Sequence, residues 1–132
     1  MQGIVNRDTP RPTDAELEIL QVLWERGACT VREVQESVSV DRTVGYTTIL
    51  KLMQIMTDKG LVRRDESERA HVYEACLAQE QTQRQLVGNL LDKAFEGSAV
   101  ELIMQALSAK RATTDELRRI RQMLDEFERG EQ

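Results

Sequence analysis

Short polar and basic side chains recur on one side of a predicted helix over residues 43–59. With Ile49 at the centre of the buried side, Thr47, Lys51, Gln54 and Asp58 fall on the opposite side. Hydroxyl and amide groups can hydrogen-bond to base edges in the major groove of DNA, and a lysine can reach guanine or phosphate. The pattern predicts a DNA-reading surface; the alternative is an ordinary solvent-exposed helix face. The candidate contacts on and before this helix are Arg42, Thr43, Tyr46, Thr47, Thr48, Lys51 and Gln54.

Three further arginines fall on a predicted β-hairpin. Arg63 and Arg64 lie on its first strand and Arg69 lies near its second, where a hairpin could meet the phosphate backbone. From Arg42 to His71 there are six Arg or Lys against four Asp or Glu, whereas the preceding residues are acidic. The alternative is a solvated strand face. His71 is expected in the second strand, either near phosphate or as an ordinary strand residue.

The residue types needed for catalysis or metal binding are scarce. His71 is the single histidine, and Cys29 and Cys76 are far apart and lack CxxC spacing. The seven glycines are scattered and form no phosphate-binding loop. We therefore expect no enzymatic activity, no metal site and no cofactor.

Four Ser/Thr-x-x-Glu sequences mark expected helix starts, since the hydroxyl and the carboxylate can each cap a backbone amide of the first turn. They are Thr13 with Glu16, Thr30 with Glu33, Ser98 with Glu101, and Thr113 with Glu116. Gly27 is expected to end the first helix. The helix over 43–59 has no such pair, and its predicted cap is Asp41 or Thr43.

The elements that must position the candidate residues follow from hydrophobic periodicity. Apolar side chains at helical spacing predict helices over 13–27, 30–38 and 43–59. Two short strands over 61–64 and 70–73, separated by polar residues, predict a hairpin wing within about 61–75. The fold class is therefore mainly α with a small β-hairpin: a winged helix-turn-helix followed by a helical region.

Three amphipathic helices are predicted after Leu77. In the last, apolar residues at spacings of three, four and three form a seam typical of pairing with another helix. We expect this C-terminal region to form a homodimer; the alternative is a bundle within one chain. The predicted dimerisation residues are Leu86, Leu90, Val100, Ile103, Leu107, Leu117, Ile120, Leu124 and Phe127.

The overall composition narrows the class of protein. The chain has 132 residues, 40% of them hydrophobic and 31% charged, and no apolar run approaches the roughly 20 residues of a membrane span. The first residues lack the apolar core of a signal peptide, so we expect a cytoplasmic protein without membrane association. Because the net charge is −5, DNA binding must come from a local arrangement of basic groups.

Five short segments, taken together in their order and spacing, resemble the BlaI/MecI-type penicillinase repressors. They are residues 24–27 (WERG), 30–34 (TVREV), 46–50 (YTTIL), 59–62 (KGLV) and 69–73 (RAHVY). The resemblance covers about residues 12–127. It implies a winged-helix domain, a helical dimerisation domain and repression at palindromic operators, with Thr47 and Lys51 in the recognition helix and Arg63, Arg64 and Arg69 in the wing.

Two departures limit what the resemblance implies about induction. In some members of the family, a membrane-bound zinc-protease sensor relieves repression, and the repressor is cut at an Asn-Phe bond. Residues 102–107 of this chain contain no such pair. The copper-responsive branch ends in a cysteine-rich site, and no cysteine follows Cys76. The sequence therefore identifies no upstream sensor or protease.

The resulting prediction is a bacterial repressor that binds palindromic double-stranded operator DNA as a homodimer. Residues 1–12 would form an arm, 13–77 the DNA-binding domain and 78–132 a three-helix dimerisation domain. The helix over 43–59 would enter the major groove and the hairpin would touch the backbone. The alternative is a protein-interaction module on a winged-helix scaffold, which the acidic net charge favours.

Overall fold

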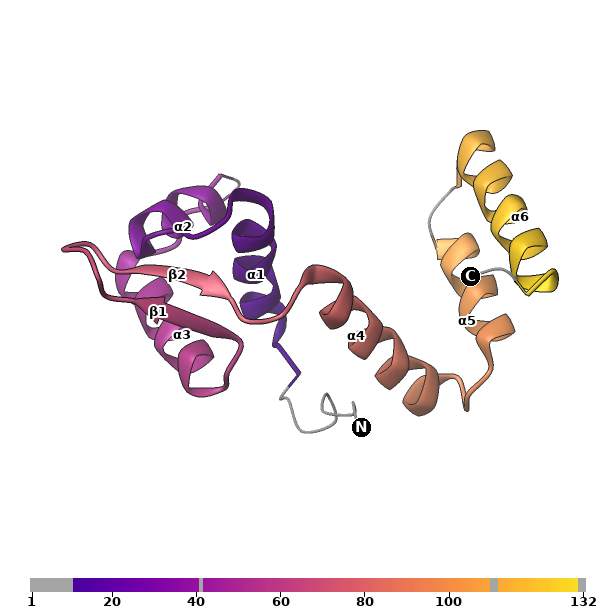
Figure 1. Ribbon diagram of the computed structural model, residues 1–132, viewed down its shortest axis with the longest axis horizontal. Coiled ribbons are helices and arrows are strands. Elements are labelled where there is room, and N and C mark those ends of the chain that lie inside the picture. The colour runs from indigo at the N-terminus through magenta and orange to yellow at the C-terminus, as the bar shows by residue number, and fades with distance from the viewer. Residues whose placement is uncertain (1–10, 41, 110–111, 131–132) are drawn as a thin grey trace. The chain divides into compact units, whose positions relative to one another are not determined.

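The computed structural model describes residues 11–40, 42–109 and 112–130 (Figure 1). In chain order the elements are α1 (Asp14–Arg26), α2 (Val31–Val38), α3 (Tyr46–Asp58), β1 (Val62–Asp65), β2 (Val72–Ala75), α4 (Gln79–Ala94), α5 (Ala99–Ala109) and α6 (Thr114–Glu128). The chain divides within α4 into two compact units, the first ending at Gly88 and the second beginning at Asn89. The predicted domains 1–12, 13–77 and 78–132 stay predictions, and most of the arm lies outside the described residues.

The predicted capping pairs begin the helices as expected. The Thr13 hydroxyl accepts from the Glu16 amide at 3.2 Å, and the Glu16 carboxylate accepts from the Thr13 amide at 3.0 Å. Thr30 with Glu33 and Thr113 with Glu116 form the same reciprocal pairs before α2 and α6. At α5, the Ser98 hydroxyl accepts from the Glu101 amide at 3.2 Å. Gly27, with φ of 88°, ends α1 as predicted.

Helix α3 begins later than predicted. Its N-cap is Gly45, which makes no side-chain cap hydrogen bond, and its first helical residue is Tyr46. The predicted cap at Thr43 is therefore wrong, and Asp41 lies outside the described residues. Arg42 and Thr43 lie in the loop before the helix.

Contacts with α2 explain this late start. The Val44 amide donates to the Ser39 hydroxyl at 3.3 Å, and Gln35 Nε2 donates to the Val44 carbonyl at 3.1 Å. These bonds hold the backbone before Gly45 as a loop against the end of α2. The first helical hydrogen bond of α3 consequently runs from the Ile49 amide to the Gly45 carbonyl, at 3.2 Å.

The hairpin forms, but its strands are shifted from the predicted ranges. β1 and β2 pair antiparallel with Val62 opposite Ala75 and Asp65 opposite Val72. Tyr73 sets this register, because its amide and carbonyl both bond to Cys29, at 2.8 and 3.0 Å, and its side chain is buried. His71 therefore precedes β2 instead of lying in it, and the loop of the hairpin extends away from the three helices (Figure 1).

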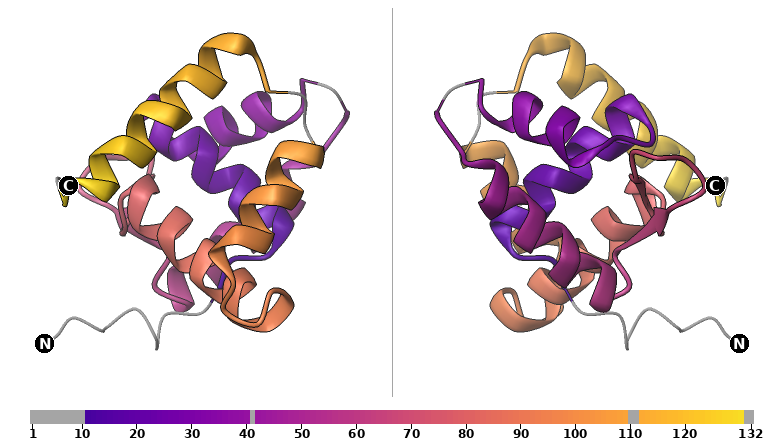
Figure 2. Two further views of the ribbon diagram at one scale, coloured as in Figure 1. Left: turned by 90° about the vertical axis from the view of Figure 1, so that its right-hand side faces the viewer. Right: turned by 90° about the vertical axis from the view of Figure 1, so that its left-hand side faces the viewer.

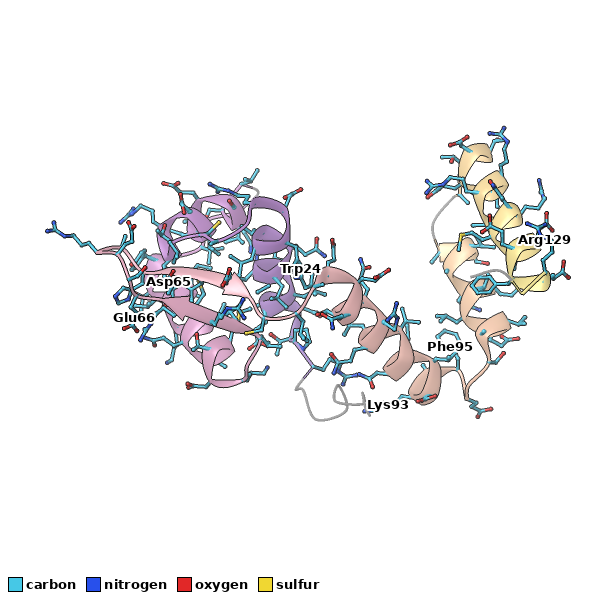
Figure 3. The ribbon with its side chains drawn as sticks, in the orientation of Figure 1. Trp24, Asp65, Glu66, Lys93, Phe95 and Arg129 are labelled. Atoms are coloured by element: carbon cyan, nitrogen blue, oxygen red, sulfur yellow. The ribbon has the colours of Figure 1, made fainter. Side chains whose placement is uncertain are left out.

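One hydrophobic core holds the first unit together. It draws on α1, α2, α3 and both strands, which lie together in the first unit (Figure 1). The Trp24 indole donates to the Leu77 carbonyl at 2.9 Å and ties the chain to α1 as it leaves β2 (Figure 3). The buried core residues are Ile19, Leu20, Leu23, Cys29, Val31, Val34, Ile49, Met53, Met56, Leu61, Val62 and Tyr73.

The second unit buries far fewer apolar side chains than the first. α5 and α6 contain no buried residue, and they lie apart from each other in Figure 2. Val100 is 68% exposed, Leu124 is 53% exposed and Phe127 is 56% exposed. The three predicted C-terminal helices are confirmed, but α5 and α6 form no packed core of their own.

Candidate nucleic-acid interface

Helix α3 separates its apolar and polar side chains on two sides. Ile49 and Met53 are fully enclosed in the core, with exposed fractions of 2% and 0%. Thr47, Lys51 and Gln54 are exposed, as are Tyr46 and Thr48. The expected sidedness of the helix is confirmed, while the roles of these residues toward DNA stay predictions.

Arg42 and Thr43, predicted as contacts, lie in the exposed loop before α3. The Arg42 guanidinium makes two hydrogen bonds to the Glu18 carboxylate of α1, at 2.7 and 3.2 Å. The hydrogen bond from Arg42 lowers the pKa of the Glu18 carboxyl. Arg42 is therefore paired with a carboxylate of α1, and a contact between Arg42 and DNA would compete with that pair.

The predicted basic residues of the wing have different surroundings. Arg63 Nε donates to Glu74 Oε1 at 2.7 Å across the hairpin, and Arg64 pairs with Glu66. Asp65 and Glu66 lie where β1 enters the hairpin loop (Figure 3). Both arginines thus carry a neighbouring carboxylate that offsets their charge locally.

Arg69 and His71 lie in the hairpin loop between β1 and β2, and His71 directly precedes β2. Both are exposed, and Arg69 takes part in no ion pair among the residues that the structure describes. Its guanidinium is the wing cation whose charge is least compensated. Because β2 begins at Val72, His71 lies outside the strand in which it was predicted, and both residues lie toward the open end of the hairpin.

One basic side chain near this surface was missed in the sequence. The Arg32 guanidinium of α2 lies 5.4 Å from the centroid of the Tyr46 ring at the start of α3. Arg32 belongs to the segment that was interpreted as a helix start, and nothing in its spacing predicts contact with a residue fourteen positions later. The three-dimensional packing of α2 on α3 brings the two together.

Catalytic and metal chemistry find little support in the described parts of the chain. Within residues 11–40, 42–109 and 112–130, no three His, Cys, Asp or Glu side chains gather as a metal site. Cys29 and Cys76 are free thiols, and burial raises the pKa of Cys29. No helix in these ranges combines the length and apolar character needed to cross a membrane.

Comparison with known proteins identifies the family of this chain. The family model described as penicillinase repressor matches residues 12–126, a range that includes α1 to α3, both strands, α4, α5 and most of α6. The chain belongs to the penicillinase repressor family. The family predicted from the five segments is therefore confirmed, and so is the winged-helix class.

Several members of this family align over most of both chains. Transcriptional regulator BlaI of Mycobacterium tuberculosis is 29% identical over 118 residues, covering 89% of this chain and 85% of that protein. The penicillinase repressor of Bacillus licheniformis is 22% identical over 117 residues, covering 89% and 91%. A solution structure of Bacillus licheniformis BlaI, in its monomeric form with the blaP half-operator, aligns with a TM-score of 0.48 and 26% identity over 55% of this chain and 88% of that chain.

Proposed function

We propose that this protein represses transcription by binding two-fold symmetric operator DNA as a homodimer, with the exposed side of α3 in the major groove. The observation that carries the proposal is the exposed polar side of α3 in a member of the penicillinase repressor family. The protein would act in the cytoplasm, where bacterial DNA lies, and repression would follow from blocking polymerase. The proposal contains no catalytic step.

The chemistry of α3 supports base recognition. Thr47 and Thr48 offer hydroxyl groups that can donate or accept, Gln54 offers an amide, and Lys51 offers a cation on the same exposed side. Ile49 and Met53 pack against the core and hold the helix rigidly at the surface. A rigid helix with short polar groups suits the major groove, which admits an α-helix.

The wing supports a second contact with the backbone. Arg69 lies in the exposed loop of the hairpin, and Arg63 and Arg64 are exposed on β1. Phosphate contacts fix the register of a protein on DNA, and they supply most of the salt-sensitive affinity. A basic hairpin beside a recognition helix would perform this role.

The C-terminal helices support association of two copies. α6 carries Leu117, Leu124 and Phe127 at 41%, 53% and 56% exposure, and α5 carries Val100 and Ile103 at 68% and 46%. Burying apolar surface of this kind is favourable by about 25 cal/mol per Å². Because neither helix buries these side chains within its own chain, a second copy with the same seam is the partner that fits.

A two-fold dimer predicts a two-fold operator. Two copies of α3 would meet inverted half-sites about one helical turn of DNA apart, and the paired C-terminal helices would set their separation. Linking the two readers raises the overall affinity, because the second half-site is then bound as an intramolecular step.

Fluorescence anisotropy with a palindromic promoter fragment tests the function. We expect nanomolar binding that weakens steeply with salt and is lost when the palindrome is scrambled at constant composition. Equal affinity for the two fragments would contradict the proposal and favour the protein-interaction module.

A further inference from the structure

We propose that Arg32, with the groove it borders, binds one backbone phosphate in each operator half-site. The inference rests on the proposed function and adds a contact outside α3 and the wing strands. The groove has a volume of about 510 Å³ and lies between α2, the first turns of α3 and the end of the hairpin. Its charged and aromatic lining residues are Arg32, Tyr46, Arg64, Arg69, His71 and Tyr73.

The charge of this groove sets it apart from the rest of the molecule. Three arginines and the single histidine line it, and no acidic side chain does so among the residues described. Arg64 is paired with Glu66 outside the lining, so Arg32 and Arg69 are the groove arginines without an ion pair among the described residues. The whole chain carries a net charge of −5. A concave surface lined by cations in an acidic protein matches a phosphodiester group, because charge complementarity guides a phosphate to that site and away from the remaining surface.

Arg32 is prepared for such a contact. Its guanidinium lies 5.4 Å from the centroid of the Tyr46 ring, within the range of a cation–π interaction. Arg32 is exposed and takes part in no ion pair among the described residues. A guanidinium that rests on an aromatic ring keeps its N–H edge open for two parallel hydrogen bonds to phosphate oxygens.

The position of Tyr46 connects the groove with the proposed reading surface. Tyr46 is the first residue of α3, directly before Thr47. If Thr47 faces base edges in the major groove of DNA, the Arg32 side chain lies at the edge of the major groove, where the phosphates of one strand run. Arg69 and His71 line the protein groove from the side of the hairpin.

Substitution of Arg32 tests the contact by operator anisotropy in a series of salt concentrations. R32A removes one phosphate contact from each of the two half-sites, so it should weaken operator binding by roughly tenfold or more and reduce the slope of log K against log salt by about 1.8, twice the value of about 0.9 for one phosphate. R32K, which keeps the charge but loses the planar guanidinium, should recover part of the affinity. The control is R84A, since Arg84 is an exposed arginine on α4 away from the groove; it should bind as the wild type does.

Neutral phosphates identify the contact itself. Operators with a methylphosphonate at one backbone position at a time should reveal one position per half-site where neutralisation weakens the wild type but has no further effect on R32A. Identical profiles for both proteins, or an R32A that binds as tightly as wild type, would overturn the inference while the proposed function stands. A wild type that does not distinguish the operator from scrambled DNA would instead overturn the proposed function.

Discussion

The basic side chains around α3 differ in how fully their charge is compensated. Arg42 pairs with Glu18, Arg63 with Glu74 and Arg64 with Glu66. Exposed pairs of this kind are screened by solvent and add little stability, so DNA could draw the arginines away at small cost. Lys51 takes part in no ion pair among the described residues, and it is the cation best placed to act directly.

Replacing Lys51 by Ala should weaken operator binding by about 1–3 kcal/mol if the ammonium group contacts a base. The loss should then depend on the base pair opposite α3, whereas a phosphate contact would weaken every sequence alike. Anisotropy on operators substituted one base pair at a time measures the difference. K93A removes an exposed lysine of α4 and should bind as wild type, and an unchanged affinity for K51A would remove Lys51 from the interface.

At the scale of elements, one ion pair joins the start of α1 to the end of α3. Lys59 Nζ lies 2.6 Å from Glu16 Oε1, and the Glu16 side chain is only 3% exposed. The same carboxylate oxygen caps α1 by accepting from the Thr13 amide at 3.0 Å. Burial raises the pKa of Glu16, but the hydrogen bonds from Lys59 and Thr13, with the charge of Lys59, outweigh it and lower the pKa below the usual 4.5.

This pair predicts a pH-dependent contribution to the stability of the first unit. Because the pKa of Glu16 is lower in the folded state, its contribution is complete above the unfolded pKa and disappears as the pH falls through the folded pKa. E16Q keeps a side chain that can cap α1 but loses the charge, and we expect it to lower the free energy of unfolding by about 1.5–3 kcal/mol at pH 7.

Urea unfolding from pH 7 down to pH 3 measures this effect. The difference between wild type and E16Q should shrink as the pH falls, since the protonated Glu16 of the wild type resembles the amide. The control is E36Q, which removes an exposed carboxylate of α2 and should show no comparable trend. A constant difference at every pH would assign the effect of E16Q to packing instead of charge.

At the scale of the whole molecule, the two units meet different physical requirements. The first unit encloses its own core, whereas α5 and α6 leave their apolar side chains at the surface. A helix with an exposed apolar seam is stable in water only when another surface covers it. Association of two copies would therefore stabilise the second unit and join two DNA-binding units in one assembly.

Replacing Leu124 by Asp should break the proposed association, because it places a charge within the seam of α6. We expect a monomer in sedimentation velocity and a loss of operator affinity of about 10²- to 10⁴-fold, as the two half-sites are then bound independently. Q122D introduces the same charge on the opposite side of α6 and should remain dimeric. A dimeric L124D would place the interface elsewhere.

Local chemistry made several features of this protein predictable from the sequence. The starts of α1, α2 and α6 follow from hydroxyl and carboxylate groups three residues apart, which meet within one helical turn wherever the helix lies. The buried and exposed sides of α3 follow from helical periodicity around Ile49. The family followed from the order of five short segments.

Contacts between residues distant in the chain decided the rest. The start of α3 depends on the hydrogen bonds that Gln35 and Ser39 make with the backbone of Val44. The hairpin register depends on the backbone pairing of Tyr73 with Cys29. The partners of the basic residues and the place of Arg32 on Tyr46 were likewise outside the reach of the sequence pattern. Periodicity shows which way a side chain faces from its own helix, but its neighbour across the fold is determined only when the elements pack.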